Sequence, residues 1–322
     1  MNSAFSETTF EPSPLNRVME QGAPGAVWQP YSASIPNSGH TLKTEYGANS
    51  SAEVKLWNIT GTGASTTAFY GVGKLYKTVF KDENWTSGKS GTSEEFKDLE
   101  GRVVLKRIWE TESASLSTYY VYDDLGNLTF VIPPAVTATS FTESNADTQF
   151  SQYIYAYRYD GRNRLIRKKI PGKGWEEMIY NEIDQLVFTQ DSVQRGLGHR
   201  SFTKYDALGR VIMTGMETMH YASREVLQGV VNSRRPLWET RDVSGTNFHG
   251  YTKPTDPWSV ENMQAGVVNY YDDYNIPGIP FNYQSSYSDR TKGLLTATKV
   301  KVLGTSDHYL WTVYIIMTIK QG

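Results

Sequence analysis

Two pairs of adjacent aspartates are the first residues of this chain that could carry chemistry, Asp123-Asp124 and Asp272-Asp273. Paired carboxylates can ligate calcium or supply the acid and the nucleophile of a glycosidase. Each pair directly follows a tyrosine, however, and lies in a phrase that recurs along the chain. The first aspartate can accept a hydrogen bond from the backbone amide two residues on and so begin a turn. We therefore expect both pairs to be turn residues and to form no catalytic or metal site.

The remaining polar motifs give no stronger candidate for catalysis or metal binding. No histidine has a second histidine or a carboxylate at metal-ligand spacing; the five are His40, His199, His220, His249 and His308. The glycine-rich segment 71–74 leads into a predicted strand, not into the helix that would hold a phosphate. The absence of cysteine excludes disulfides, thiolate catalysis and cysteine-ligated zinc. The sequence thus predicts a non-enzymatic chain without a cofactor.

Charge and aromatic content leave two binding hypotheses open. The net charge of −2 gives no general attraction to nucleic acid or to an anionic membrane. The densest basic run could bind nucleic acid, but a solvated strand face that discourages edge-to-edge pairing is the favoured interpretation; it comprises Arg162, Arg164, Arg167, Lys168, Lys169 and Lys173. The many aromatic residues fit a thin sheet that must bury apolar area, or else they stack on sugars or nucleobases. Candidates for exposed, sugar-stacking rings are Trp57, Trp85, Trp175 and Trp258.

The elements that must position these residues are specified by the repeated phrase itself. It consists of Tyr-Asp, two spacers, glycine, a polar residue and an apolar residue, and its best copies are residues 122–128 and 205–211. Looser copies are 159–165 and 180–186, and 271–275 keeps only the opening. The repeat residues are Tyr122, Asp123, Gly126, Tyr159, Asp160, Asn163, Tyr180, Asn181, Asp184, Tyr205, Asp206, Gly209, Tyr271 and Asp272. Repetition of this kind usually specifies an architecture and not a reaction.

Each position of the phrase has the chemistry of a β-hairpin. Asp or Asn at the second position opens a turn, and three residues later stand Gly, Asn or Asp, which best tolerate a left-handed backbone. That combination describes a type I turn closed by a bulge. The polar and apolar residues that follow begin the alternation of a strand with one buried face, and the flanking segments are rich in aromatic and β-branched types. We therefore predict four good hairpins over residues 118–214.

Weaker copies extend the pattern toward both ends of the chain. Residues 10–18 resemble a copy with two extra residues, and residues 99–105 keep only the second half of the phrase. After Tyr271-Asp272, Pro277 and Gly278 replace the returning strand. Glycine and serine crowd residues 61–73 and 86–93, which predicts long loops there.

These patterns predict a mainly β chain of antiparallel β-hairpin repeats that form a curled sheet or partial shell, with two minor helices over 141–150 and 221–231. The expected organisation is a partial repeat and connection over 1–36, an antiparallel β region over 37–112, and the repeat hairpins over 113–215. A helix plus an irregular insertion follows over 216–265, and further, truncated β repeats over 266–322. No segment has the length or apolar content of a signal peptide or a membrane-spanning helix.

The phrases resemble the YD repeats of bacterial RHS (rearrangement hotspot) proteins, which also occur in insecticidal toxin complexes and in animal teneurins. The segments that carry the resemblance are 157–165, 202–210 and 13–17, and they are similar to those of the large RHS proteins of Bacteroidetes. The resemblance implies a strip of hairpins that coils into a hollow shell around a toxic carboxy-terminal domain, in a parent protein that is secreted or on the cell surface. Its implied partners are the rest of that shell and the toxin domain. The family's self-cleaving core segment and a toxin domain have no counterpart in this sequence, so their chemistry is not transferred.

Both ends of the chain suggest a fragment, and the closing segment suggests a frameshift. After Tyr314 the repeat pattern stops, whereas one codon choice read one base earlier restores a Tyr-Asp opening. The apolar, uncharged segment 311–317 also predicts poor solubility. The leading hypothesis is a structural shell segment of an RHS protein without activity of its own. The alternative is a cell-surface β module that binds a carbohydrate or another partner.

Overall fold

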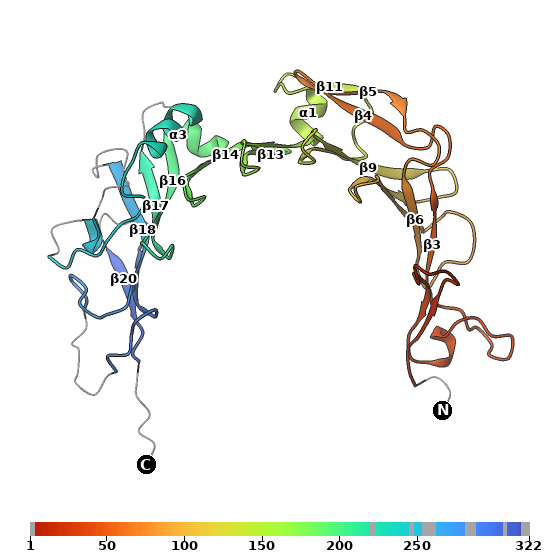
Figure 1. Cartoon of the computed structure of the whole chain (residues 1–322), viewed down its shortest axis with the longest axis horizontal. Helices are drawn as coiled ribbons and strands as arrows, with labels where there is room; N and C mark the ends of the chain where they lie inside the picture. The colour runs from red at the N-terminus through yellow and green to blue at the C-terminus, as the bar shows by residue number, and fades with distance from the viewer. Residues whose placement is uncertain are drawn as a thin grey trace, which may run out of the picture. The chain divides into compact units, whose positions relative to one another are not determined.

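The computed structural model describes residues 4–218, 223–244, 248–252, 262–280, 288–304 and 308–316. The fold is mainly β, as the sequence predicts: seventeen of the described strands belong to an antiparallel sheet of hairpins and three to a smaller sheet, with few short helices (Figure 1). The chain divides into two compact units, which are described separately.

The first unit comprises Met1–Tyr159 and Lys169–Gly172. Each of its main strands pairs antiparallel with the next in this series: β1 (Glu7–Phe10), β2 (Val18–Gly22), β3 (Leu42–Ala48), β6 (Tyr76–Lys81), β7 (Ser93–Lys97), β8 (Val103–Trp109), β9 (Ser115–Tyr122), β10 (Leu128–Ile132) and β12 (Tyr155–Tyr159). A short 3-10 helix, η1 (Ala26–Trp28), lies between β2 and β3. Because successive strands are neighbours, the unit is a meander whose connections are turns and short insertions.

A small sheet and a helix pack together in the first unit. The sheet consists of β4 (Lys55–Thr60), β5 (Gly63–Phe69) and β11 (Ser140–Thr142), and the helix is α1 (Thr148–Tyr153) (Figure 1). An aromatic cluster fills the space between these elements and the main strands. Phe141 contacts Phe130 edge-on with ring centroids 5.0 Å apart, and it stacks on Phe150 at 6.1 Å. These rings exclude water from the inner face of the small sheet.

Two expectations for this region were wrong. Residues 61–73 were predicted to be a loop but contain β5, because Gly63 allows the backbone of β11 to approach closely enough to pair. A Cβ atom on Gly63 would lie 2.0 Å from the Phe141 carbonyl oxygen. The helix predicted over 141–150 begins only at Thr148, where Asp147 accepts a hydrogen bond from the Phe150 amide, and Phe141 belongs to a strand instead.

The second unit comprises Asp160–Lys168 and Lys173–Gly322. Its strands again pair in chain order: β14 (Gly174–Tyr180), β15 (Leu186–Gln190), β16 (His199–Tyr205), β17 (Val211–Thr218), β18 (Met263–Tyr271), β19 (Leu295–Lys301) and β20 (Tyr309–Val313). Strand β13 (Leu165–Ile170) contributes residues to both units. The remaining elements are α2 (Ser192–Gly196), α3 (Arg224–Asn232) and the 3-10 helix η2 (Phe248–Gly250).

The core of the second unit lies on one face of its strands and under α3. Ile212 and Met213 of β17 are fully buried, and Leu227 and Val231 of α3 join the same cluster. Helix α3 packs against β14 (Figure 1), and it agrees with the helix expected over 221–231 except at its first residues, of which 221 and 222 lie outside the described residues. Helix α2 was not predicted; it starts with a capping box between Asp191 and Gln194. None of the helices in the described ranges is long and apolar enough to span a membrane.

We predict that Gly63→Ala destabilises the first unit, because the added methyl group collides with the β11 backbone. Forced overpacking typically costs about 1–3 kcal/mol, and a lower midpoint of thermal unfolding would report it. Gly61→Ala is the matched control, since a Cβ atom there meets nothing within 4 Å. Equal midpoints for the two variants would contradict this account of β5.

Candidate functional site

The repeated turns are held by one carboxylate or amide side chain each. At Asp98, Asp123, Asp160, Asn181 and Asp206 the backbone N–H donates to the carbonyl four residues on, at 2.9 to 3.1 Å. In each turn one side-chain oxygen accepts from the amides two and four residues on, at 2.8 to 3.2 Å. Both of the turn's inward amides are thereby satisfied by the same oxygen. These side chains are engaged in structure and are poorly placed to act as general acids, general bases or metal ligands.

The residue three positions after each of these side chains has a left-handed backbone. The φ values are 82° at Gly126, 58° at Asn163, 63° at Asp184 and 77° at Gly209. Its N–H donates to the carbonyl of the turn-opening residue, at 2.9 to 3.2 Å. Gly, Asn and Asp adopt this conformation at the lowest cost, which explains why the position accepts only these types.

Two further turns of the same kind are more complete than the sequence indicated. Residues 99–105 were expected to keep only half of the phrase, but Asp98 opens a full turn whose left-handed residue is Gly101. The copy was overlooked because Lys97 stands where the phrase has tyrosine. In the copy with two extra residues, Glu11 takes the aspartate's place and accepts two hydrogen bonds from the Arg17 guanidinium, at 2.8 and 2.7 Å.

A register shift accompanies the turns at a constant position. In six hairpins the second residue of the returning strand is an extra residue, so two residues of that strand face one of its partner; the extra residues are Met19, Val104, Thr129, Val187, Ile212 and Thr296. The partner residue is the one that precedes the turn-opening side chain, such as Tyr122 or Tyr205. A bulge of this kind bends the strand and increases its twist. The shift was not evident from the sequence because it depends on pairing between strands.

Four tyrosines of the phrase, and Tyr46 outside it, connect their hairpin to the preceding one. Five tyrosine hydroxyls donate to the carbonyl of the first residue after the previous turn, at 2.9 to 3.1 Å: Tyr46 to Val18, Tyr122 to Val103, Tyr180 to Leu165, Tyr205 to Leu186 and Tyr271 to Val211. Backbone pairing of that strand with the next begins only two residues later, for example at Phe188 after Leu186 and at Met213 after Val211. The hydroxyl therefore binds a carbonyl that lies just outside the backbone pairing.

In four turns an arginine at the end of the turn contacts both the acid that opens the turn and the tyrosine of the following hairpin. Arg17, Arg102, Arg164 and Arg210 each pair with the acid that opens their own turn. Each guanidinium also lies over the ring of the tyrosine that bonds to the following carbonyl, 4.1 to 5.2 Å from the ring centroid. In the two turns that lack arginine, Asn127 and Gln185 bond to the turn-opening side chain. We call these turn acids, arginines and tyrosines the turn network.

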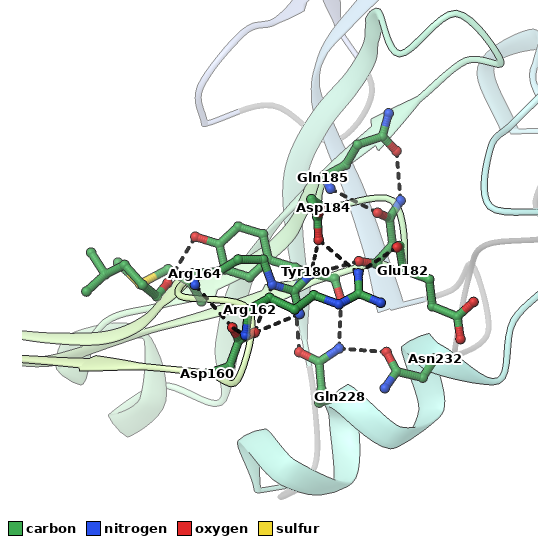
Figure 2. Close-up of polar contacts among 12 residues, drawn as sticks. Asp160, Arg162, Arg164, Tyr180, Glu182, Asp184, Gln185, Gln228 and Asn232 are labelled. Carbon is green, nitrogen blue, oxygen red and sulfur yellow. Dashed lines mark hydrogen bonds and ion pairs between the residues drawn. The ribbon is translucent and has the colours of Figure 1, made fainter. Parts of the chain in front are cut away.

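Figure 2 shows the turn network where two hairpins of the second unit meet. Arg164 bonds to Asp160 of its own turn and to the Asp184 side chain of the next turn, at 2.8 Å to each. Arg162 reaches the same Asp184 carboxylate at 3.1 Å and the Glu182 carbonyl at 2.9 Å. Adjacent turns are thus joined by charge-assisted hydrogen bonds between side chains.

Helix α3 is attached to this network through one side chain. The Gln228 amide donates to the Tyr180 carbonyl at 2.6 Å, and its oxygen accepts from the Tyr180 N–H at 3.4 Å (Figure 2). Tyr180 lies at the register shift of its hairpin, so its backbone groups can be met by a side chain. The same Gln228 amide donates to Asn232, which holds the glutamine in place.

The fifth repeat tyrosine leads into a turn with a long insertion, which corrects one expectation. The returning strand after Tyr271-Asp272 is not replaced by Pro277 and Gly278; it is β19, which starts at Leu295. The Asp272 N–H donates to the Leu294 carbonyl at 3.0 Å, and the Asp272 carboxylate accepts from the Gly293 amide at 2.6 Å. Arg210 binds the same carboxylate through two hydrogen bonds, at 3.0 and 2.6 Å.

The ion pairs of the turn network shift pKa values in the directions that favour charge. The Arg17 guanidinium lowers the pKa of Glu11 to about 2, and Arg210 lowers the pKa of Asp272. Burial opposes ionisation of Asp160, but the hydrogen bonds from Arg164 and two backbone amides outweigh it and lower its pKa. Burial raises the pKa of the Tyr180, Tyr205 and Tyr271 hydroxyls, which therefore remain hydrogen-bond donors at neutral pH.

The cations of the basic run are largely ion-paired, and one of them is buried. Arg167 pairs with Glu177 and Lys168 with Glu176, while Lys173 contacts Glu176 at 3.1 Å. Lys169 is 2% exposed, and its ammonium group donates to three backbone carbonyls around the end of α1, those of Phe150, Ser151 and Ile154. Most of this run thus lies on a partly exposed strand face, as expected, but cross-strand acids pair with its cations, and Lys169 is buried against helix-end carbonyls.

The remaining sequence candidates are dispersed or covered. Trp57 is buried at 9% exposure, so its place among the exposed sugar-stacking rings was wrong. Lys81 lies 3.9 Å over the ring of Trp85, Arg167 lies 5.0 Å over that of Trp175, and Trp258 lies outside the described residues. His220 also lies outside them, and within the described ranges no group of three histidines or acids could hold a metal ion.

Comparison with known proteins gives a short sequence match and several distant structural ones. A family model described as a domain of unknown function, DUF6443, matches residues 1–42. No curated protein matches the chain. The crystal structure of TcdB2-TccC3-TEV aligns with 92% of this chain and 15% of that one, at 13% identity and a TM-score of 0.36.

Two other solved structures align in the same way. The crystal structure of TcdB2-TccC3 aligns with 96% of this chain and 15% of its own, at 14% identity and a TM-score of 0.28. The structure of a Photorhabdus luminescens Tc holotoxin pore aligns with 96% of this chain and 17% of its own, at 13% identity and a TM-score of 0.25. The chain therefore spans less than a fifth of the length of each of these structures.

We predict that Arg210→Met destabilises the second unit by about 1–3 kcal/mol, because it leaves the Asp206 and Asp272 carboxylates without their partner. Chemical denaturation measures the difference. Arg162→Met is the matched control, since its side chain is 57% exposed and the exposed pair with Asp184 should contribute no more than about 1 kcal/mol. Equal losses in the two variants would argue against a special role for the turn network.

The lowered pKa of Glu11 predicts a pH dependence of stability. Its folded pKa of about 2 is below the ordinary value of 4.5, so its contribution is complete above pH 4.5 and is lost as the pH falls toward 2. Thermal unfolding of wild type and Glu11→Gln should therefore differ most above pH 4.5 and converge toward pH 2. A stability difference that stays constant over this pH range would refute the assignment. Glu7→Gln on exposed β1 serves as the control variant.

Proposed function

We propose that this chain is a structural segment of an RHS/YD-repeat shell, without catalytic activity of its own, that helps to enclose or present a toxin domain in its parent protein. The observation that carries the proposal is the repetition of one set of contacts in successive hairpins. A turn-opening carboxylate or amide, a left-handed residue, a register shift and a tyrosine-to-carbonyl bond recur together at Asp123, Asn181 and Asp206. Because each hairpin uses the same contacts to join the preceding one, further hairpins can be added to the sheet in the same way.

The use of the polar residues also favours a scaffold. Of the acids that the sequence offers as catalysts, Asp123, Asp272 and Asp273 accept hydrogen bonds from their own turn. Arg210 of the turn network binds Asp272 and covers the ring of Tyr271. Such side chains would have to leave their structural partners before they could bind a substrate. The same geometry suits the sheet of a shell, in which similar hairpins repeat and their charged side chains pair with one another.

The proposal is tested first with the DNA on both sides of the coding region. We expect further copies of the Tyr-Asp phrase in the parent and a domain that lacks it. That domain should arrest growth of a bacterial host when expressed alone and be harmless and protected from protease when joined to the repeats. Flanking DNA without further phrases, or a domain that is equally exposed in both contexts, would contradict the proposal.

A glycan array with the purified chain tests the competing function of a carbohydrate-binding module. A scaffold predicts no saturable binding to any glycan. Saturable binding that is lost in a Trp85→Ala or Trp175→Ala variant would overturn the scaffold proposal in favour of the binding module.

A further inference from the structure

A cavity of about 420 Å³ in the second unit is unrelated to the turn network. It lies over β14, β15 and β16, between the carboxy-terminal end of α2 and the amino-terminal end of α3. Buried apolar side chains form part of its wall, those of Ile179, Phe188 and Leu227. Its charged lining consists of Arg167, Arg195, Arg200, Arg224, Glu177 and Glu225. Four arginines around one cavity are not required by the repeat.

Positive charge at this cavity is only partly neutralised. Arg167 and Arg195 share the single carboxylate of Glu177, at 3.1 and 3.2 Å. Arg200 is paired with buried Glu217 and adds no excess charge. Two guanidinium groups that share one carboxylate leave one positive charge that Glu177 does not match. Arg167 and Arg195 are 40% and 41% exposed, so this charge is open to a solute that enters the cavity.

Arg224 adds a further cation, so that Glu225 is the one remaining acid of the lining for two unmatched positive charges. Its side chain is 9% exposed, and its Nε donates to the Met178 carbonyl at 3.2 Å. Its Nη2 reaches the Gln228 amide oxygen at 3.5 Å, so its near acceptors are neutral. The nearest acid, Glu225, is 4.0 Å away. Arg224 is therefore a buried cation at the wall of the cavity whose hydrogen bonds are made mainly to uncharged acceptors.

Glu225 marks the place that an anion favours. Its carboxylate hydrogen-bonds to its own backbone amide and to Ser223 at the start of α3, and with nearby Arg224 and Arg167 these contacts lower its pKa. The side chain itself is 72% exposed, so it stands at the edge of the cavity without filling it. The start of a nine-residue helix adds backbone N–H groups that favour negative charge.

We infer that this cavity binds a small organic oxyanion, a carboxylate or phosphate group attached to an apolar or aromatic body. The planar guanidinium groups of Arg195 and Arg224 match the oxygens of either group. Ile179, Phe188 and Leu227 supply the apolar surface for the body. The inference does not depend on the proposed shell function, since every residue it uses lies outside the repeat phrases.

Isothermal titration calorimetry of the full chain at low salt tests the inference with four probes. Phenyl phosphate and benzoate present the two oxyanions on the same aromatic body, inorganic phosphate lacks the body, and benzyl alcohol lacks the charge. We expect saturable 1:1 binding of phenyl phosphate, benzoate or both, weaker binding of inorganic phosphate and none of benzyl alcohol. The tighter of the two aromatic probes identifies the preferred oxyanion. No binding of either aromatic anion, or equal binding of benzyl alcohol, would overturn the inference.

Variants place the binding at this cavity. Arg195→Gln and Arg224→Gln should each weaken binding about tenfold, the loss expected for one charge-assisted hydrogen bond. Glu225→Gln should strengthen binding several-fold because a competing anion is removed. Arg235→Gln, outside the cavity and paired with Glu182, should bind as wild type does. Arg195 is 41% exposed, so its variant should stay folded by circular dichroism even if Arg224→Gln does not. Wild-type affinity in folded Arg195→Gln would overturn the inference.

Discussion

A tyrosine hydroxyl that binds the first carbonyl after the preceding turn is the interaction on which this arrangement of hairpins depends. The register shift at the end of each hairpin bends the returning strand, and pairing with the next strand begins two residues later. Without a donor at that point, a carbonyl such as that of Leu186 would lie beside an aromatic ring with no partner in the backbone. Tyr205 meets it at 2.9 Å, and its half-buried ring becomes the surface on which neighbouring side chains pack.

The arginine that ends the turn makes the contact between hairpins less easily broken. In Arg210 one guanidinium binds the acid of its own turn, binds the acid of the next turn and covers the ring of Tyr271. Removing any one of these partners leaves the others less well satisfied, because a partly satisfied polar network is costly in a poorly hydrated place. This coupling explains why acids that resemble catalytic pairs in the sequence are bound by structural partners in the fold.

Much of the local structure could be predicted because the phrase states it residue by residue. The turn at 122–128 follows from one aspartate, one glycine and the alternation after them, and the mainly β class follows from repetition of that pattern. The parts that could not be predicted depend on residues distant in the sequence. Strand β5 exists because Gly63 accepts the approach of Phe141, and β19 returns to Tyr271 across a long insertion. Lys169 illustrates the same limit, since only the fold brings the end of α1 to its ammonium group.

A double-mutant cycle between Arg210 and Asp272 tests most directly whether successive hairpins are coupled through the turn network. The two residues are 62 positions apart and meet through two hydrogen bonds. Unfolding free energies of wild type, Arg210→Met, Asp272→Asn and the double variant give their interaction energy. The account predicts a coupling of at least about 0.5 kcal/mol, the lower end for residues in one network. Strictly additive losses would contradict it.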